Sequence, residues 1–415
     1  MTRHLLRLIW NRKRQNFLLT VEIFFSFLTL FGVVLLAVHY GNNARQPLGY
    51  DIDRLWSIAV DRKESDQDPA VKARLRETYG LLMSTLRGMP QIEVVAAAFT
   101  GPYANANWGS TTRLVGGRNV HYGVNYVSDD HLGLLRIPLV AGRWFSREDD
   151  AATWTPVVLN RRLARDIFGA ADPVGQIIKE EPDPNAPPPD PNDTPEVKRV
   201  IGVVAAFRQN GELSSSEGYM FRRMRLDDPA AKAALPERLF VRLRPGTTAA
   251  FEETLVRQAM NVANDWSFEV QPLDTMRQDK LRQYTIPLAV VATIAAFLLL
   301  MVGLGLTGVV WQSVTQRIRE FGLRRAKGAT IPDVRAQVLL EMVIMTSIAL
   351  VAGVLLLAQL PLLPLPPDLR IVPAPVFVGS IAISVAAIYL LTLACGWYPS
   401  RLATRIQPAE ALHYE

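Results

Sequence analysis

IPLAVVATIAAFLLLMVGLGLTGVVW, residues 286–311, is an almost uninterrupted apolar run that decides the class of this protein. A helix needs roughly 20 apolar residues to cross the hydrocarbon core of a bilayer, and this run is long enough. Runs of the same kind occupy residues 17–38, 338–360 and 376–397. Most polar residues lie in one block between residues 41 and 284. The sequence therefore predicts a membrane protein with four transmembrane α-helices and a large α+β extracytoplasmic domain inserted between helices 1 and 2.

These runs divide the chain into segments. We expect a basic cytoplasmic segment at 1–16, transmembrane helices at 17–40, 285–312, 336–361 and 374–397, an extracytoplasmic domain at 41–284, a cytoplasmic link at 313–335, a short external loop at 362–373 and a cytoplasmic tail at 398–415. The first run follows a basic start, as the apolar region of a signal peptide does. It is longer than the usual 7–15 residues of that region, and no convincing cleavage site follows it. We interpret it as an uncleaved anchor.

Lysine and arginine near the runs predict the orientation, because cytoplasmic segments of membrane proteins carry an excess of both. Basic residues without acidic neighbours precede the first run, and others fill the link between the second and third runs. They are Arg3, Arg7, Arg12, Lys13 and Arg14, and then Arg317, Arg319, Arg324, Arg325, Lys327 and Arg335. Both termini and this link are therefore predicted inside. The net charge of +6 reflects this topology and not nucleic-acid binding, since the outer block is close to charge balance.

The outer block mixes strand and helix patterns. Short apolar runs at Ile92–Ala98, 156–159 and 199–205 predict buried strands. Apolar spacing predicts helices at 70–86, Arg161–Phe168 and 249–262, so we expect an α+β domain, with two subdomains. The proline-rich stretch EPDPNAPPPDPNDTP, residues 181–195, predicts an extended surface loop, with partner docking as the alternative. The single cysteine, Cys395, lies in the fourth run and excludes an intramolecular disulfide.

Motifs for catalysis and cofactor binding are missing from the sequence. It contains no G-x-x-x-x-G-K-[ST] phosphate loop, no H-E-x-x-H and no Cys/His cluster. The trio Asp129, Asp130 and His131 is better explained as a turn before a short strand or helix than as a catalytic group. We therefore expect no catalytic residue, no bound cofactor or metal, and no enzymatic activity in this chain.

A few residues inside the apolar runs are unusual for a membrane. Glu22 and Glu341 each lie close to the predicted cytoplasmic end of a helix, where a carboxylate can pair with arginine. Pairing is one interpretation, and a helix–helix contact that shifts between conformations is the other. Gly303, Gly305 and Gly308 let helices approach closely, either within the bundle or between two subunits. A subunit interface is slightly favoured.

Several segments resemble the MacB/FtsX-like ABC transporter permeases. The resemblance includes VTQRIREFGLRRAKGAT at 314–330 and WYPSRLATRIQPAEALHYE at 397–415. AGRWFSREDD at 141–150, TPVVLNRRLARDIFGAADPVGQII at 155–178 and IGVVAAFR at 201–208 are similar to the family's periplasmic core domain. Glu341 also falls where the family often has a glutamate. These segments run from one end of the chain to the other, in the order that the predicted topology requires.

This resemblance implies a permease subunit of the mechanotransmission type in the bacterial inner membrane. Some members carry a fused nucleotide-binding domain, whereas here the anchor begins the chain, so we expect ATP and Mg²⁺ on a separate cytoplasmic ATPase dimer. A second copy or a homologous permease, a periplasmic adaptor and an outer-membrane channel are the other candidate partners. The predicted ATPase-coupling residues are Arg317, Arg319, Glu320, Gly322, Arg324, Arg325, Gly328 and Ala329.

The resemblance leaves the cargo open. Export of an antimicrobial peptide or small molecule is the first hypothesis. The alternatives are control of a cell-envelope process through a cell-wall hydrolase, and lipoprotein release. The branch of the family that controls cell division usually has a much smaller outer domain, which favours export. A membrane-anchored enzyme is the weakest hypothesis, because no catalytic constellation is present.

Overall fold

The computed structural model describes residues 13–63, 68–105, 108–181, 196–226, 235–317, 323, 328–362 and 372–403. The chain forms two compact units, each considered by itself below. One consists of Met1–Asn42 with Tyr284–Glu415, and the other of Asn43–Gln283. We call them the membrane unit and the outer unit. Most of the predicted loop at 181–195 lies outside the described residues, so its role stays a prediction.

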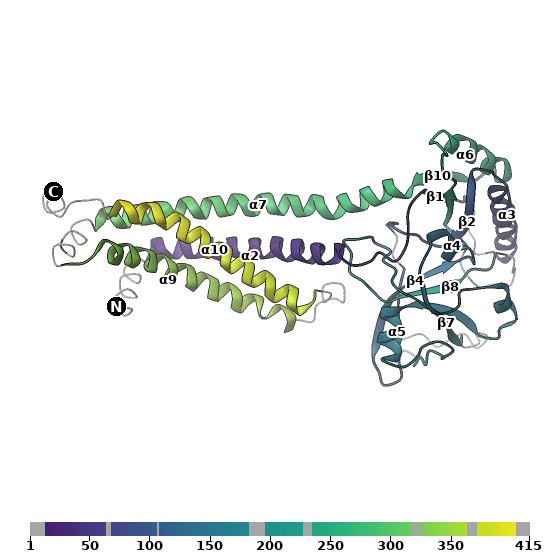
Figure 1. Ribbon diagram of the computed structural model, residues 1–415, viewed down its shortest axis with the longest axis horizontal. Coiled ribbons are helices and arrows are strands. Elements are labelled where there is room, and N and C mark those ends of the chain that lie inside the picture. The colour runs from purple at the N-terminus through teal and green to yellow at the C-terminus, as the bar shows by residue number, and fades with distance from the viewer. Residues whose placement is uncertain are drawn as a thin grey trace. The chain divides into compact units, whose positions relative to one another are not determined.

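Four helices of the described chain are long and apolar enough to cross a membrane (Figure 1). They are α2 (Lys13–Ala44), α7 (Leu273–Gln316), α9 (Ile331–Leu357) and α10 (Ala374–Ala403), and a 3₁₀ turn, η2 (Leu360–Leu362), follows α9. The four-helix prediction is confirmed. Helix α7 begins well before the apolar run, and its 44 residues span about 66 Å at 1.5 Å per residue. It therefore exceeds the roughly 30 Å hydrocarbon core.

Small residues let the helices of the membrane unit pack closely. A side chain at Gly353 of α9 would meet the Phe27 ring of α2 at 2.6 Å, so only glycine fits this contact. Helices α9 and α10 are also joined by hydroxyl pairs, Thr346 with Thr392 at 3.1 Å and Ser347 with Tyr389 at 2.8 Å. Such contacts drive helix association in a bilayer, where apolar burial contributes little.

The outer unit is built on one ten-stranded sheet with helices on it (Figure 1). Its elements in chain order are β1 (Leu55–Asp61), α3 (Pro69–Arg87), β2 (Ile92–Ala98), β3 (Gly109–Arg113), β4 (Asn119–Val127), α4 (His131–Leu135), β5 (Leu139–Gly142), η1 (Arg147–Ala151), β6 (Thr155–Asn160), α5 (Arg161–Phe168), β7 (Lys198–Val204), β8 (Tyr219–Arg223), β9 (Arg238–Leu243), α6 (Phe251–Val262) and β10 (Ser267–Pro272). The order of strands is β10-β1-β9-β2-β4-β8-β6-β7-β5, and β3 pairs with β4. The α+β prediction is confirmed.

One half of the sheet is a split βαβ arrangement. The units β1–α3–β2 and β9–α6–β10 interleave their strands in the order β10-β1-β9-β2, and all three pairings are antiparallel. Alternate residues of β2 face opposite sides, as the strand period of two requires. Val95 and Ala97 pack in the cluster with α3 and α6, whereas Ala96 and Ala98 pack in the cluster with α4. This two-sided burial explains why Ile92–Ala98 is so apolar.

The other half of the sheet is inserted between β2 and β9. It meets the first half at β2 and β4, where one residue pair, Ala98 with Val127, is in register. The Ser128 hydroxyl extends this join by accepting a hydrogen bond from the Ala97 amide at 2.9 Å. Parallel pairs β4–β8 and β6–β7 make this half a mixed sheet, and α5 packs against it in its own core cluster.

A fully buried arginine ties the first half of the sheet to α4 of the inserted half. The guanidinium of Arg242 on β9 donates to the carbonyl oxygens of Leu134 at 2.9 Å, Asp53 at 2.7 Å and Asp51 at 3.1 Å. These acceptors lie on α4 and on the segment that precedes β1. Because buried carbonyl groups need donors, one side chain fixes three chain segments at once.

Candidate coupling sites

The end of α7 is fastened to α9 by an ion pair within the membrane unit. Arg317 Nη1 lies 2.9 Å from Glu341 Oε1 and 3.0 Å from Oε2, and the two side chains are only 11% and 20% exposed. A partly buried, charge-assisted contact of this kind holds its partners more firmly than an exposed pair. Pairing with a nearby arginine, one of the two interpretations of Glu341, is therefore present.

The turn before α9 explains the sequence KGAT. Gly328 has φ of 98°, in the left-handed region that glycine adopts without strain. Thr330 then caps α9, because its backbone amide and hydroxyl both donate to Asp333 Oδ2, at 3.0 and 2.5 Å. Ala329 lies between these two residues. The other predicted coupling residues, Arg319, Glu320, Gly322, Arg324 and Arg325, lie outside the described residues, and their roles stay predictions.

The glycines of α7 have different surroundings. A Cβ at Gly305 would lie 3.2 Å from Glu22 Oε2 of α2, and one at Gly303 would lie 3.4 Å from Cys395 Sγ of α10. Both glycines therefore pack against helices of the same chain. A Cβ at Gly308 would meet no atom within 4 Å, so a subunit interface stays a prediction for that position. Glu22 forms no ion pair in the described part of the chain.

A loop of the outer unit, residues 207–215 between β7 and β8, holds the end of α2. We call it the Arg208 loop. Arg208 is 2% exposed and donates hydrogen bonds to the carbonyl oxygens of Asn43 at 2.8 Å, Gln46 at 3.2 Å and Glu212 at 2.6 Å, and to that of Ser214. Asn43 in turn donates from Nδ2 to the Leu213 carbonyl at 3.1 Å. Since the last carbonyl groups of a helix have no partner within it, Arg208 supplies donors that the end of α2 requires.

The same loop also holds the beginning of α7. The Glu212 carboxylate accepts a hydrogen bond from Arg277 Nε at 2.5 Å and another from Tyr103 Oη at 3.3 Å. Burial raises the pKa of Tyr103, and the nearby Glu212 charge raises it further, so the phenol remains a proton donor to this carboxylate. The Arg208 loop therefore contacts both the end of α2 and the beginning of α7.

Helix α7 has polar contacts near both of its ends. In the outer unit the helix is bonded at Arg277 to the Arg208 loop, and in the membrane unit its other end is bonded at Arg317 to α9. Tyr40 of α2 also stacks edge-on against Tyr284 of α7, with ring centroids 5.5 Å apart. Pro287 lies within α7 between these two ends, where a proline removes one backbone hydrogen bond.

The trio Asp129, Asp130 and His131 has structural partners. Arg223 donates to both oxygens of Asp129 at 2.8 Å, Arg87 contacts Asp130 at 2.6 Å, and α4 begins at His131. The turn interpretation is confirmed. His131 is fully buried beside Phe221 and Phe240, and neither ring nitrogen has a hydrogen-bond partner. Burial lowers the pKa of His131 to about 3.

We expect His131→Phe to remove part of the acid sensitivity of the protein. Between pH 6.5 and 3 the unfolded chain binds a proton at this imidazole that the folded chain does not bind. The free energy of unfolding therefore falls by about 1.4 kcal/mol per pH unit as the pH drops through this window. Urea unfolding of both proteins from pH 7 to 4.5 checks the difference. Equal slopes of the free energy of unfolding against pH in the two proteins would contradict this prediction. His121→Phe, at an exposed position, is the control.

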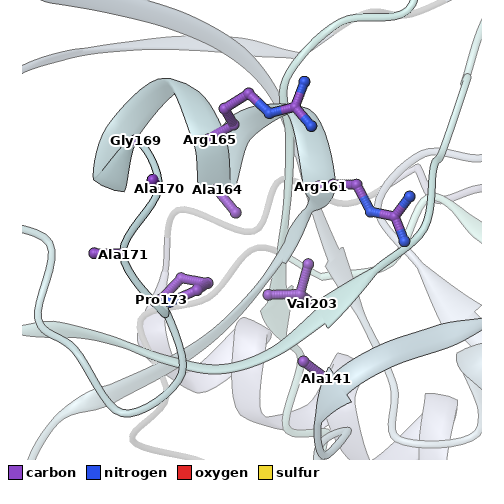
Figure 2. A pocket seen from close by; sticks show the side chains of 9 residues that line it. All are labelled: Ala141, Arg161, Ala164, Arg165, Gly169, Ala170, Ala171, Pro173 and Val203. Carbon is purple, nitrogen blue, oxygen red and sulfur yellow. The ribbon is translucent and has the colours of Figure 1, made fainter.

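The described residues offer no obvious catalytic centre. No group of three or more His, Cys, Asp and Glu side chains within them could hold a metal ion. A hollow of about 620 Å³ lies beside α5 and β7. Figure 2 shows Arg161 and Arg165 of α5 among the residues that line it. The rest of its lining is small and apolar, including Ala164, Ala171 and Val203. Such a lining has no group that could activate a nucleophile.

Sequence reasoning missed the Arg208 loop and the burial of His131. Arg208 ends the apolar stretch that begins in β7, and an arginine at such a place is a weak signal of a buried carbonyl-binding role. Glu212 and Arg277 are far apart in sequence, so no local pattern could connect them. Nothing in the sequence indicates that His131 is buried, since its neighbours Asp129 and Asp130 indicate a polar turn.

A protein with four candidate membrane helices and an inserted sheet domain is the class that this fold defines. Residues 23–258 match the model of the MacB-like periplasmic core domain, and residues 292–408 match that of the FtsX-like permease C-terminal domain. The first match covers more than half of the chain. The protein therefore belongs to the MacB/FtsX-like ABC transporter permease family, as the resemblance predicted.

Three relatives illustrate the family. The chain is 27% identical over 350 residues to the pyoverdine export ATP-binding/permease protein PvdT of Pseudomonas aeruginosa, covering 78% of this chain and 48% of that protein. It is 28% identical over 289 residues to the macrolide export ATP-binding/permease protein MacB of Bdellovibrio bacteriovorus, covering 66% and 41%. It is 22% identical over 299 residues to the uncharacterized ABC transporter permease YknZ of Bacillus subtilis, covering 70% of each. The chain thus spans about half the length of the curated export relatives that it matches first.

Two solved structures align with part of the chain at low sequence identity. The periplasmic region of MacB from Actinobacillus actinomycetemcomitans aligns with a TM-score of 0.36 and 16% identity, covering 56% of this chain and 94% of that one. The extracellular domain of YknZ aligns with a TM-score of 0.34 and 15% identity, covering 51% and 99%.

Proposed function

We propose that this chain is the permease subunit of an ABC transporter that relays ATP-driven motion to its outer unit. The work comes from a separate cytoplasmic ATPase dimer, and the cargo is an antimicrobial peptide or small molecule for export. Family membership and the export functions in the names of the PvdT and MacB relatives support this proposal.

The observation that carries the relay is the pair of contacts along α7. Motion of the cytoplasmic link changes the position of Arg317, which is bonded to Glu341 of α9. Helix α7 carries this motion to Arg277, which is bonded to Glu212 of the Arg208 loop. That loop also binds the end of α2 through Arg208, so one loop receives displacement from two helices. Mechanotransmission of this kind does not require a pore for the cargo.

The remaining features of the proposal concern location and assembly. We place the chain in the bacterial inner membrane, and the arginine distribution supports an orientation with both termini in the cytoplasm and the outer unit in the periplasm or outside the cell. Two copies, or this chain and a homologue, form the permease pair over the ATPase dimer. A periplasmic adaptor and an outer-membrane channel complete the export route in the proposal.

Reconstitution with the cognate ATPase tests the proposal. The two proteins should copurify, and the complex in nanodiscs should hydrolyse ATP at least about tenfold faster than the isolated ATPase, a change of roughly 1.4 kcal/mol in the barrier. Failure to form a complex, or ATP turnover no faster than that of the isolated ATPase, would contradict it. Loss of the gene should then sensitise cells to an exported compound, whereas filamentation would favour control of the cell wall.

A further inference from the structure

A cavity of about 580 Å³ in the outer unit has charged lining residues that the proposed relay does not use. It lies among β1, the segment after β2, the first residues of β9, β10 and the polar first turns of α7. Its charged lining residues are Glu237, Arg238, Glu269, Asp279 and Lys280, and its aromatic residues are Phe99 and Tyr103. Its volume lies in the range of small-molecule sites, roughly 300–1,000 Å³.

Both cations in this cavity lack a carboxylate partner. Arg238 donates from Nη1 to the Ser57 hydroxyl at 3.0 Å, and it forms no ion pair in the described part of the chain. Burial lowers the pKa of Arg238, although Glu269 and Glu237 partly oppose this effect. Lys280 Nζ lies 3.4 Å from Asn105 Oδ1, and no described carboxylate pairs with it. Glu269 and Glu237 partly compensate the charge of Arg238, whereas the partly buried Lys280 has no such compensation, so an anionic group in the cavity would stabilise Lys280 most.

Carboxylates line the same cavity. Glu237 has no ion pair among the described residues, and Glu269 accepts only a neutral hydrogen bond, from Gln271 Nε2 at 2.6 Å. Asp279 is engaged elsewhere, because Arg282 lies 3.5 Å from it. The cavity therefore presents two cations and two solvent-exposed carboxylates that form no direct ion pair with one another in the described part of the chain. A simple anion would meet repulsion from Glu237 and Glu269, whereas a molecule with both charges can pair with both sets.

The uncharged lining fits an apolar body with polar edges. Phe99 is 8% exposed and its ring is held edge-on by Trp108, with centroids 4.7 Å apart. Met276 adds a buried, polarisable surface from α7. The amides of Asn105, Gln271 and Gln283 also line the cavity and can donate to or accept from a peptide group.

We propose that this cavity binds a zwitterionic, amino-acid-derived molecule such as a short peptide. Its carboxylate pairs with Arg238 and Lys280, its ammonium group pairs with Glu237 and Glu269, and an apolar side chain packs on Phe99. Binding at this site does not depend on the proposed transport function. The identification of this ligand class with the exported cargo does rest on it.

The test uses the full chain in nanodiscs without any ATPase, so that failure of transport cannot affect the result. The probe is the dipeptide Phe-Leu, measured by calorimetry or ligand-detected NMR. Two blocked forms serve as matched ligands, N-acetyl-Phe-Leu without the ammonium group and Phe-Leu amide without the carboxylate. Phe-Leu should bind saturably, and each blocked form should bind about tenfold more weakly, the effect of one lost charged contact.

Variants connect each ligand charge to its residue. Arg238→Gln and Lys280→Gln should each weaken binding of Phe-Leu about tenfold and leave binding of Phe-Leu amide unchanged. Arg257→Gln, on the exposed side of α6, is the matched control and should have no effect. Thermal unfolding of each variant identifies any that fails to fold. If Arg238→Gln does, Lys280→Gln on α7 carries the test.

Three results would overturn the proposal. One is no saturable binding of Phe-Leu up to about 10 mM, which corresponds to less than about 3 kcal/mol. Another is equal affinity for Phe-Leu and its amide. The third is unchanged affinity in the folded Lys280→Gln and Arg238→Gln proteins. Tighter binding of N-acetyl-Phe-Leu than of Phe-Leu would also contradict the role of Glu237 and Glu269.

Discussion

Arg208→Gln is expected to lower the free energy of unfolding of the outer unit by about 3–5 kcal/mol, because four carbonyl oxygens lose a charged donor in a buried place. Glutamine offers one amide group with two donors where arginine has five. Arg208→Lys should recover little of the lost stability, since one ammonium group cannot reach all of these carbonyl oxygens as the planar guanidinium does. The end of α2 is then no longer held by the Arg208 loop.

Thermal unfolding of the full chain in detergent measures this effect. The unfolding temperature of the outer unit should fall by roughly 10 °C, given 2–4 °C per kcal/mol for a domain of this size. Arg257→Gln is the control, because Arg257 pairs with Glu253 on the exposed face of α6, and its side chain is 68% exposed. A change within about 0.5 kcal/mol in Arg208→Gln, equal to an ordinary surface substitution, would refute the role given to Arg208.

Reversal of two charges in the cytoplasmic link should uncouple the ATPase. Arg324→Glu with Arg325→Glu replaces two cations by two anions in the segment proposed to contact an acidic surface of the ATPase. Like charges across an interface are strongly unfavourable. We expect ATP turnover by the reconstituted complex to fall at least about tenfold, with loss of copurification in the extreme case.

The control reverses two positive charges in the N-terminal segment, which is also predicted to be cytoplasmic. Arg3→Glu with Arg7→Glu changes the N-terminal segment by the same amount, so it tests whether topology alone accounts for a loss. This control should assemble and turn over ATP close to the wild-type rate. If the Arg324 and Arg325 double variant also kept normal assembly and turnover, the link would not be the coupling surface.

Much of the fold follows from local sequence patterns. Uninterrupted apolar runs predict the four membrane helices, and the periods of strands and helices predict Ile92–Ala98 and Arg161–Phe168 with the bounds that the structure has. The split βαβ order could not be predicted from local patterns. Strands β2 and β9 are neighbours in the sheet, but the inserted half-sheet separates them in the sequence. Single-sequence periodicity contains no information about such long-range pairing.

The candidate sites were predictable only in part. The ion pair of Glu341 could be expected, because arginines follow the second run and a carboxylate near a membrane interface is costly without a partner. The contacts of Arg208 with Asn43 and of Glu212 with Arg277 could not, because each joins residues far apart in the chain. The charged cavity around Arg238 and Lys280 could not be predicted either, because the fold assembles it from five segments that lie far apart in the sequence.

Hydrogen exchange at the Arg208 loop tests the central claim most directly, namely that nucleotide on the cytoplasmic side changes the outer unit through α2 and α7. The full complex in nanodiscs is compared without nucleotide and trapped with ATP and vanadate. Our account predicts that amides of residues 207–215 change their exchange rates at least about fivefold, or roughly 1 kcal/mol in local opening, whereas amides of helix α5 do not change. Identical exchange at residues 207–215 in both states, with ATP bound and the complex intact, would contradict it.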